Sequence, residues 1–163
     1  MPLVTLTIRE GKSGEFKSAV LGAVHSALIA SGVPEKDRFQ RVLELSSDDF
    51  RFDPEYPDLT ARRTDDFVLI EILLSVGRSV KVKKKIVADI LAGLSKGLGL
   101  NAENVMVCFK ETLWENWSFG GEANTVSQPD MAAGLRGQVK KYSKIRKRFG
   151  RCRFGARPND YTV

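Results

Sequence analysis

Hydrophobic and polar positions recur in a regular order along the first part of the chain. Residues 2–8 (PLVTLTI) alternate, which predicts a short β-strand. Residues 13–31 carry apolar side chains at three- and four-residue spacing, as on one face of a helix. Ser13 is suited to be the N-cap of this helix, and Gly32 lies just past its end, where glycine commonly closes a helix. A weaker strand pattern follows over residues 38–45.

A second unit of the same kind comes next. Residues 67–75 (FVLIEILLS) form an apolar run typical of a strand buried on both faces, residues 79–98 follow a helical pattern, and residues 105–109 (VMVCF) predict another strand. Moving the first unit by 67 residues superimposes the two patterns, for example Gly32 on Gly99. The sequence therefore predicts an α+β fold of two layers. Tandem β-α-β units would form a four-stranded mixed sheet with two helices on one face.

The tandem arrangement also predicts which residues meet at one edge of the sheet. Each crossover makes the two strands of its own unit parallel. If the units pair about a pseudo-twofold axis, strand 2–8 runs antiparallel to strand 67–75, and the first strand begins beside the end of the third. The second strand begins at the same edge. This pairing would bring together Pro2, Asp37 and Arg78, whereas a different strand order would separate them.

Pro2 becomes an N-terminal secondary amine once Met1 is removed. An α-amino group titrates at about 7.7–8.0, so it is partly neutral at physiological pH. A nearby cation such as Arg78 and an apolar pocket both disfavour the ammonium and would lower this pKa further. The amine would then be a base poised near neutrality and a nucleophile toward carbonyls. Many proteins carry proline at position 2 by chance, so Pro2 alone does not establish a site.

Four further positions are candidates for the same site, each with a structural alternative. Arg78, in SVGRSV, could bind a carboxylate through its bidentate fork, or it could be a solvated surface arginine. Asp37, in VPEKDRFQ, could orient a water or carry a proton, or it could cap a turn. Trp117 and Phe119, in NWSFGGEA, could wall an apolar pocket, or they could be ordinary packing residues.

The charge divides the chain into two parts. The net charge is +6, but residues 125–163 hold ten Lys or Arg against two acidic residues, so residues 1–124 are mildly acidic. We expect a folded domain over residues 1–124 and a basic, largely disordered extension over residues 125–163. The extension interleaves its basic residues with aromatic ones, as nucleic-acid binders do.

Within the domain, residues 48–66 form a long polar loop, and such loops are usually functional or disordered.

The remaining composition argues against several classes of protein. No window approaches the roughly 18 consecutive apolar residues of a membrane span, and the start has no signal-peptide pattern, which indicates a cytoplasmic protein without a membrane partner. Cys108 and Cys152 agree with a reducing compartment and lack the spacing of a metal site, which the lone His25 cannot complete. We therefore expect no metal and no cofactor. His25 and Cys108 are interpreted as packed residues.

Four motifs in order resemble the tautomerase superfamily, and within it the group that includes malonate semialdehyde decarboxylase. These motifs are MPL at the start, GVPEKDRFQ around Asp37, RRTDDFVLIEILLSVGRS leading to Arg78, and ENWSFGGEA with Trp117 and Phe119. They extend from Pro2 to about residue 123, roughly three-quarters of the chain. Four ordered motifs are far more specific than a proline at position 2.

The resemblance implies a β-α-β-β-α-β protomer, usually in a homotrimer, with Pro2 at the base of an apolar pocket. It implies that Pro2 acts as a general base in keto–enol tautomerisation of a small 2-oxo acid, or as a general acid in hydration reactions. In the decarboxylase, two arginines separated by one residue bind the substrate carboxylate, and an aspartate assists. Arg78 matches the second arginine, and Asp37 matches the aspartate.

Val76 occupies the place of the first arginine, so the sequence departs from the decarboxylase pattern at this position. Arg62 or Arg63 from the long loop could supply the missing contact, and Arg63 is the candidate substrate ligand. The sequence thus favours a tautomerase, an isomerase, with a decarboxylase or hydratase as the alternative. A hypothesis of another class is a non-catalytic protein that binds anionic partners, such as nucleic acid, through residues 125–163.

Overall fold

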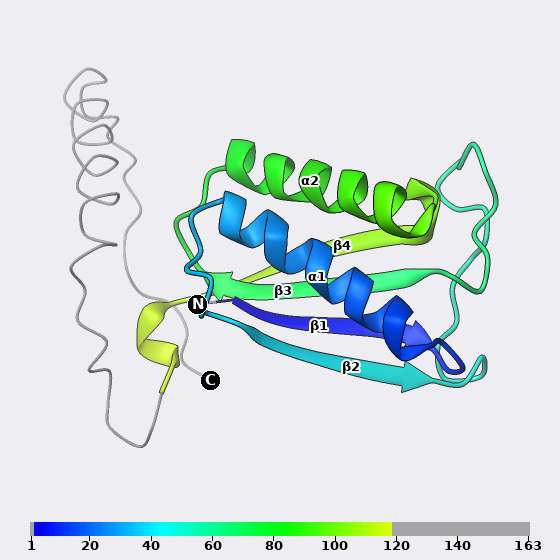
Figure 1. Cartoon of the computed structure of the whole chain (residues 1–163), viewed down its shortest axis with the longest axis horizontal. Helices are drawn as coiled ribbons and strands as arrows, with labels where there is room; N and C mark the ends of the chain where they lie inside the picture. Colours follow the sequence, from blue (N-terminus) through cyan, green and yellow to red (C-terminus); the bar gives the residue numbers. More distant parts are fainter. Residues whose placement is uncertain (1, 119–163) are drawn as a thin grey trace, which may run out of the picture. The chain divides into compact units, whose positions relative to one another are not determined.

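The computed structural model describes residues 2–118 (Figure 1), and the predicted basic extension lies outside this range together with Phe119. Two β-α-β units follow one another along the chain. The elements are β1 (Pro2–Arg9), α1 (Gly14–Ala30), β2 (Phe39–Leu45), β3 (Val68–Ser75), α2 (Val80–Leu98), the short 3-10 helix η1 (Ala102–Asn104), β4 (Val105–Thr112) and the 3-10 helix η2 (Trp114–Asn116).

The four strands form one mixed sheet in the order β2-β1-β3-β4. Strand β1 is parallel to β2, β3 is parallel to β4, and the two units join where β1 runs antiparallel to β3. Both helices lie on one face of this sheet (Figure 1) and pack against each other. The predicted α+β fold and its strand pairing are therefore confirmed. Pro2 stands directly opposite Leu74 in the register of β1 and β3.

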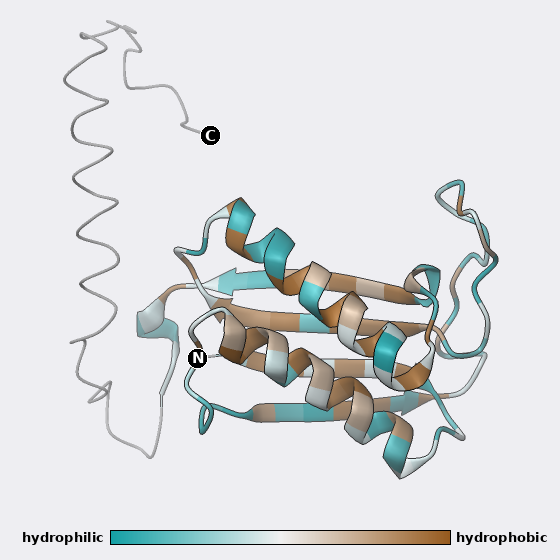
Figure 2. Ribbon diagram, turned by 45° about the horizontal axis from the view of Figure 1, so that its top comes forward, coloured by the Kyte–Doolittle hydropathy of each residue, from teal (hydrophilic) through white to brown (hydrophobic). Residues whose placement is uncertain are grey.

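The core lies between the helices and the two central strands, which are largely hydrophobic (Figure 2). Alternate residues of each central strand point toward the helices, because successive side chains of a strand face opposite sides of the sheet. The fully buried side chains of this layer include Val4, Leu6 and Ile8 of β1, Val68, Ile70, Ile72 and Leu74 of β3, Val20, Val24 and Leu28 of α1, and Ile86, Ile90 and Leu94 of α2.

The two units have closely matching boundaries. Ser13 caps α1 by accepting a hydrogen bond from the Phe16 amide, and Ser79 caps α2 in the same way from the Val82 amide. The offset between the two caps is 66 residues, whereas Gly32 and Gly99, both at positive φ beyond the helix ends, are 67 apart. The predicted offset of 67 thus holds at the two glycines and is one residue too long at the starts of the helices.

The face of the sheet opposite the helices carries exposed apolar side chains. Phe39 is 47% exposed, Leu43 42% and Met106 50%, and all three alternate with residues that face the helices. Between them lies a polar row in which Arg41 donates to the Thr5 hydroxyl at 2.8 Å. Among the described residues, neither helix covers this side. No helix of this part of the chain is long and apolar enough to cross a membrane.

Candidate active site

The residues predicted to meet at one edge of the sheet do so. Pro2 is buried and begins β1. Because Leu3 pairs with Phe39, the turn that carries Asp37 leads into β2 next to the start of β1. Strand β3 ends at Ser75, beside the start of β1, and Arg78 lies between this strand and α2. Three segments that are distant in the sequence thus reach the same edge of the sheet, and they carry Pro2, Asp37 and Arg78.

Arg78 is the cation of this edge. Its guanidinium is partly buried, and Nη1 lies 3.5 Å from the Ser75 carbonyl oxygen. Burial lowers the pKa of the Arg78 guanidinium, and the carboxylates of Asp37 and Glu111 oppose this shift. An arginine remains charged under all ordinary conditions. The edge therefore holds a partly desolvated positive charge that interacts with two nearby carboxylates, a suitable partner for an anionic substrate.

Different interactions hold the two carboxylates near Arg78, those of Asp37 and Glu111. The Asp37 backbone amide donates to the Pro34 carbonyl at 3.0 Å, which fixes the turn, and its side chain is partly buried. Glu111, near the end of β4, accepts a hydrogen bond from Lys83 of α2 at 2.6 Å. Glu111 was not among the residues selected from the sequence, because nothing in the pattern of β4 distinguishes it from an ordinary strand carboxylate.

Trp117 follows β4 at the same edge. Thr112, the last residue of β4, pairs with Ser75, and η2 begins two residues later. The Trp117 amide donates to the Trp114 carbonyl at 3.1 Å, and the indole is partly buried. The chain therefore brings one of the two predicted aromatic residues to the end of the sheet where Pro2 lies. Phe119, the other one, is outside the described residues.

Arg63 lies at the opposite end of the sheet. It precedes the start of β3, whereas Pro2 pairs near its end, and an eight-residue strand is about 25 Å long. The Arg63 guanidinium donates to the carbonyls of Asp53, Tyr56 and Glu103, and it stacks over the Phe67 ring at 5.1 Å. Its interactions hold the long loop in place. Within one chain, Arg63 is not available as the substitute for the arginine missing at Val76.

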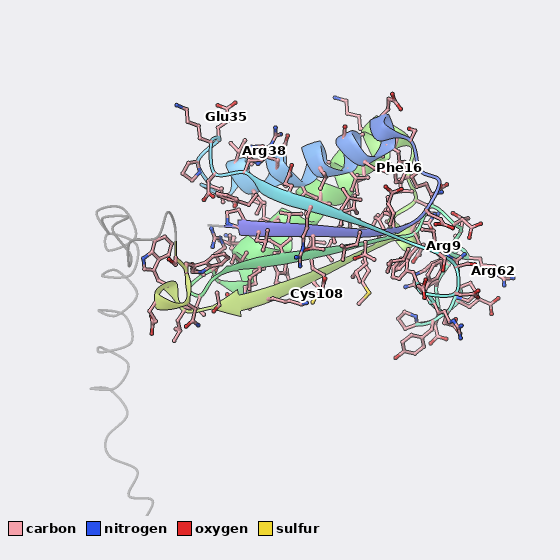
Figure 3. All side chains as sticks on the ribbon, turned by 90° about the horizontal axis from the view of Figure 1, so that it is seen from below. Arg9, Phe16, Glu35, Arg38, Arg62 and Cys108 are labelled. Atoms are coloured by element: carbon pink, nitrogen blue, oxygen red, sulfur yellow. The ribbon has the colours of Figure 1, made fainter. Side chains whose placement is uncertain are left out.

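Arg62, the neighbouring alternative, is exposed and pairs with Glu55 at 3.8 Å. Figure 3 shows Arg62 and Arg9 at the loop end of the molecule, and Glu35 and Arg38 at the end where β1 begins. The residues of this loop end enclose a shallow hollow of about 450 Å³, which does not include Pro2. Neither loop arginine of the described chain therefore reaches the edge that carries Pro2.

Ser75 is a residue of this edge that the sequence patterns did not single out. It is the last residue of β3, only 2% exposed, and its hydroxyl has no hydrogen-bond partner among residues 2–118. A buried hydroxyl without a partner is uncommon in folded proteins. One sequence signal could have drawn attention to it, since Ser75 is the first uncharged polar residue after the apolar run of β3.

The described residues contain no group of three His, Cys, Asp or Glu side chains that could hold a metal ion. His25 is buried on α1, where its Nε2 lies 3.0 Å from the Glu35 carbonyl oxygen. Cys108 is partly buried on β4. The polar side chains that the structure brings to the Pro2 edge are those of Arg78, Asp37, Glu111 and Ser75.

Comparisons with known proteins show the family to which this fold belongs. A family model described as "Tautomerase enzyme" matches residues 37–120, just over half of the chain. A malonate semialdehyde decarboxylase inhibited by 3-bromopropiolate is 28% identical, with a TM-score of 0.68 over 74% of this chain and 92% of the other. A second set of malonate semialdehyde decarboxylase structures, concerned with decarboxylase and hydratase activities, is 25% identical with a TM-score of 0.68 over 83% and 98% of the chains.

A symmetric trimer of a fused 4-OT protein has the same fold at 22% identity, with a TM-score of 0.58 over 81% of this chain and 98% of the other. The family model begins at Asp37 and includes Arg78 and Trp117, so it covers most of the edge that surrounds Pro2. The chain belongs to the tautomerase enzymes, and it resembles malonate semialdehyde decarboxylase within them.

Proposed function

We propose that this enzyme uses the N-terminal amine of Pro2 as a general base in the keto–enol tautomerisation of a small 2-oxo acid. The observation that carries the proposal is the antiparallel register of β1 and β3, which puts buried Pro2 beside the strand end that leads to Arg78. An amine at this position adjoins a partly desolvated cation. Removal of Met1 is required, because an acylated proline nitrogen has no basic lone pair.

In this reaction the amine moves one proton between two atoms of the substrate. The neutral Pro2 nitrogen takes the proton of the enol hydroxyl, and the electrons of the O–H bond re-form the carbonyl as the carbon–carbon double bond opens. The resulting ammonium delivers a proton to the carbon that has gained the electron pair. The amine returns to its neutral form, so the step balances without a cofactor. A general base of this kind typically contributes a factor of about 10² to 10⁴.

The other residues of the edge would bind and orient the substrate. Arg78 offers a fork of N–H donors that matches a carboxylate, and its partial burial strengthens the interaction. Asp37 would hold Arg78 in position and favour a substrate with a single carboxylate over one with two, because a second negative charge would face it. Trp117 would provide an apolar wall.

A second candidate function is decarboxylation or hydration of a three-carbon oxo acid, which the similarity to malonate semialdehyde decarboxylases favours. Here Pro2 would act as an acid: its ammonium would hydrogen-bond the aldehyde oxygen while the bond to the carboxylate breaks, CO₂ leaves and the enolate is then protonated on carbon. The pH dependence separates the two functions. Base catalysis is lost as pH falls through the amine pKa, whereas acid catalysis is lost as pH rises through it.

We also propose that the protein is a homotrimer that buries the helix-free face of the sheet. Phe39, Leu43 and Met106 give this face exposed apolar side chains, and large exposed patches of this kind commonly mark interfaces. The fused 4-OT protein of the same fold is described as a symmetric trimer. Neighbouring protomers would then pack against this face of the sheet.

The first experiment is the replacement Pro2→Ala, with ketonisation of phenylenolpyruvate as the assay. The mass of the intact protein first establishes that Met1 is absent from both proteins. We expect kcat/KM to fall by about 10²-fold or more, because alanine supplies a primary amine with different basicity and geometry. Pro54→Ala, at the loop end, is the matched control and should leave kcat/KM unchanged.

Undiminished ketonisation by Pro2→Ala would contradict the proposal. Release of CO₂ from malonate semialdehyde, measured with the same variants, tests the second candidate. A decarboxylase that loses this activity in Pro2→Ala, and that ketonises phenylenolpyruvate poorly, would reverse the order of the two functions.

A further inference from the structure

Ser75 has an unusual environment for a serine. It is 2% exposed, and its hydroxyl makes no hydrogen bond with any residue of the described chain. A buried hydroxyl without a partner destabilises a folded protein, because it has lost its hydrogen bonds to water. The buried hydroxyl of Thr5 in the same sheet, in contrast, accepts a hydrogen bond from Arg41. The Ser75 hydroxyl is thus a buried hydrogen-bonding group that has no partner among residues 2–118.

The strand register places this hydroxyl at the proposed reaction centre. Pro2 stands opposite Leu74, and β1 runs antiparallel to β3. One step further along the register, Ser75 faces the position directly before Pro2, which is vacated when Met1 is removed. Residues opposite each other across an antiparallel pair have Cβ atoms about 4.5–5.5 Å apart. Because Ser75 directly follows Leu74, the partner of Pro2, it lies next to the start of β1, where the Pro2 nitrogen is.

Ser75 also adjoins the proposed carboxylate ligand. Its backbone carbonyl accepts from Nη1 of Arg78 at 3.5 Å, and Ser75 pairs with Thr112 of β4 on its other side. A small acid held by Arg78 would present its oxo or enol oxygen next to the carboxylate, within a few ångströms of both the amine and this hydroxyl. The Val76 side chain, in contrast, offers no polar group at the next position.

We propose that Ser75 is a substrate-binding residue whose hydroxyl donates a hydrogen bond to the carbonyl or enol oxygen of the 2-oxo acid at Pro2. This inference rests on the proposed function of the same site. The bond strengthens as negative charge develops on that oxygen, because hydrogen bonds to charged acceptors are stronger than neutral ones. Ser75 thereby supplies a polar contact to the substrate next to Arg78. Position 76 cannot supply such a contact, because it carries a valine.

The test is Ser75→Ala, with ketonisation of phenylenolpyruvate, the pH profile and the melting temperature as readouts. We expect kcat/KM to fall about five- to fiftyfold, the range for one lost hydrogen bond to a group that gains charge. The acid limb of the pH profile should stay in place, because the amine itself is unchanged. The melting temperature should remain equal or rise, since the variant removes an unpartnered buried hydroxyl.

Ser46→Ala is the matched control. Its hydroxyl donates to the Asp49 carboxylate at 2.7 Å at the far end of β2, so its loss should leave kcat/KM unchanged. An unchanged kcat/KM in Ser75→Ala would overturn the proposal, whatever the melting temperature. An acid limb that moves with the substitution would also overturn it, by assigning the hydroxyl to the amine rather than to the substrate.

Pro2→Ala, measured alongside, separates this inference from the proposed function. If Pro2→Ala abolishes the reaction and Ser75→Ala equals the wild type, the Ser75 contact alone is wrong. If Pro2→Ala is fully active, the amine mechanism and the Ser75 contact at the amine are both wrong.

Discussion

At the Pro2 edge, two opposite electrostatic effects act on the guanidinium of Arg78. Burial disfavours the charged form of Arg78 and lowers its pKa, while the carboxylates of Asp37 and Glu111 act in the other direction. A charged guanidinium that is partly buried away from water interacts more strongly with a carboxylate than a guanidinium in bulk water does. Arg78 is therefore the residue from which we expect the largest contribution to substrate binding.

Replacing Arg78 with alanine should raise KM by about 10- to 100-fold, the range for a lost hydrogen bond to a charged group. Arg78→Lys should recover only part of this loss, because lysine keeps the charge but lacks the planar fork. Steady-state kinetics with phenylenolpyruvate measure both effects. Arg38→Ala is the control, since Arg38 is an exposed arginine at the same edge (Figure 3). Equal KM values in Arg78→Ala and the wild type would exclude Arg78 as the carboxylate ligand.

At the scale of elements, the two helices have matching caps in different surroundings. Ser79 caps α2 immediately after Arg78, and Ser13 caps α1 at the opposite edge of the sheet. Both side chains accept a hydrogen bond from the amide three residues later. The start of α2 thus orders the segment that carries the proposed carboxylate ligand, whereas the start of α1 has no part in the site.

Ser13→Ala and Ser79→Ala should each lower the free energy of unfolding by about 1 kcal/mol, the usual loss for an N-cap. Only Ser79→Ala should also reduce kcat/KM, because fraying of the first turn of α2 releases Arg78. Urea denaturation measures the first quantity and steady-state kinetics the second. Comparable kcat/KM in the two variants would show that the α2 cap does not position the site.

At the scale of the whole molecule, the sheet has two unequal faces. The helices bury one face, while the other exposes Leu43 at 42% and Met106 at 50%. An apolar face of this kind is stable in water when another surface covers it. Three copies of one sheet would bury three such faces together, and their edges would then surround each Pro2.

Leu43→Glu and Met106→Lys should each shift the protein from trimers toward monomers, because each places a charge in the proposed interface. Light scattering after gel filtration measures the mass in solution. Tyr56→Glu is the control: Tyr56 is 73% exposed in the loop, away from this face, so the variant should keep the wild-type mass. A wild-type protein that runs as a monomer would contradict the proposed assembly.

The sequence by itself determined the elements. The alternation of residues 2–8, the apolar run of β3 and the cap Ser13 are local patterns, and each fixes a local structure through backbone geometry. The meeting of Pro2 with Arg78 followed only from an assumed pairing of the two units, and the tertiary structure decided that β1 pairs with β3. The four motifs that resemble the tautomerase superfamily were likewise read from short stretches of the sequence.

Only the tertiary structure decided which groups at that edge have partners. Arg63 and Arg78 are both arginines next to a predicted strand, yet Arg63 donates to two carbonyls of the loop and one of η1, whereas Arg78 lies at the Pro2 edge. Ser75 carries no sequence signal of burial without a hydrogen bond, because this property depends on atoms from three strands at once. The periodicity of the sequence determines which face of a strand or helix a side chain occupies. The packing of distant segments determines which residues that side chain contacts.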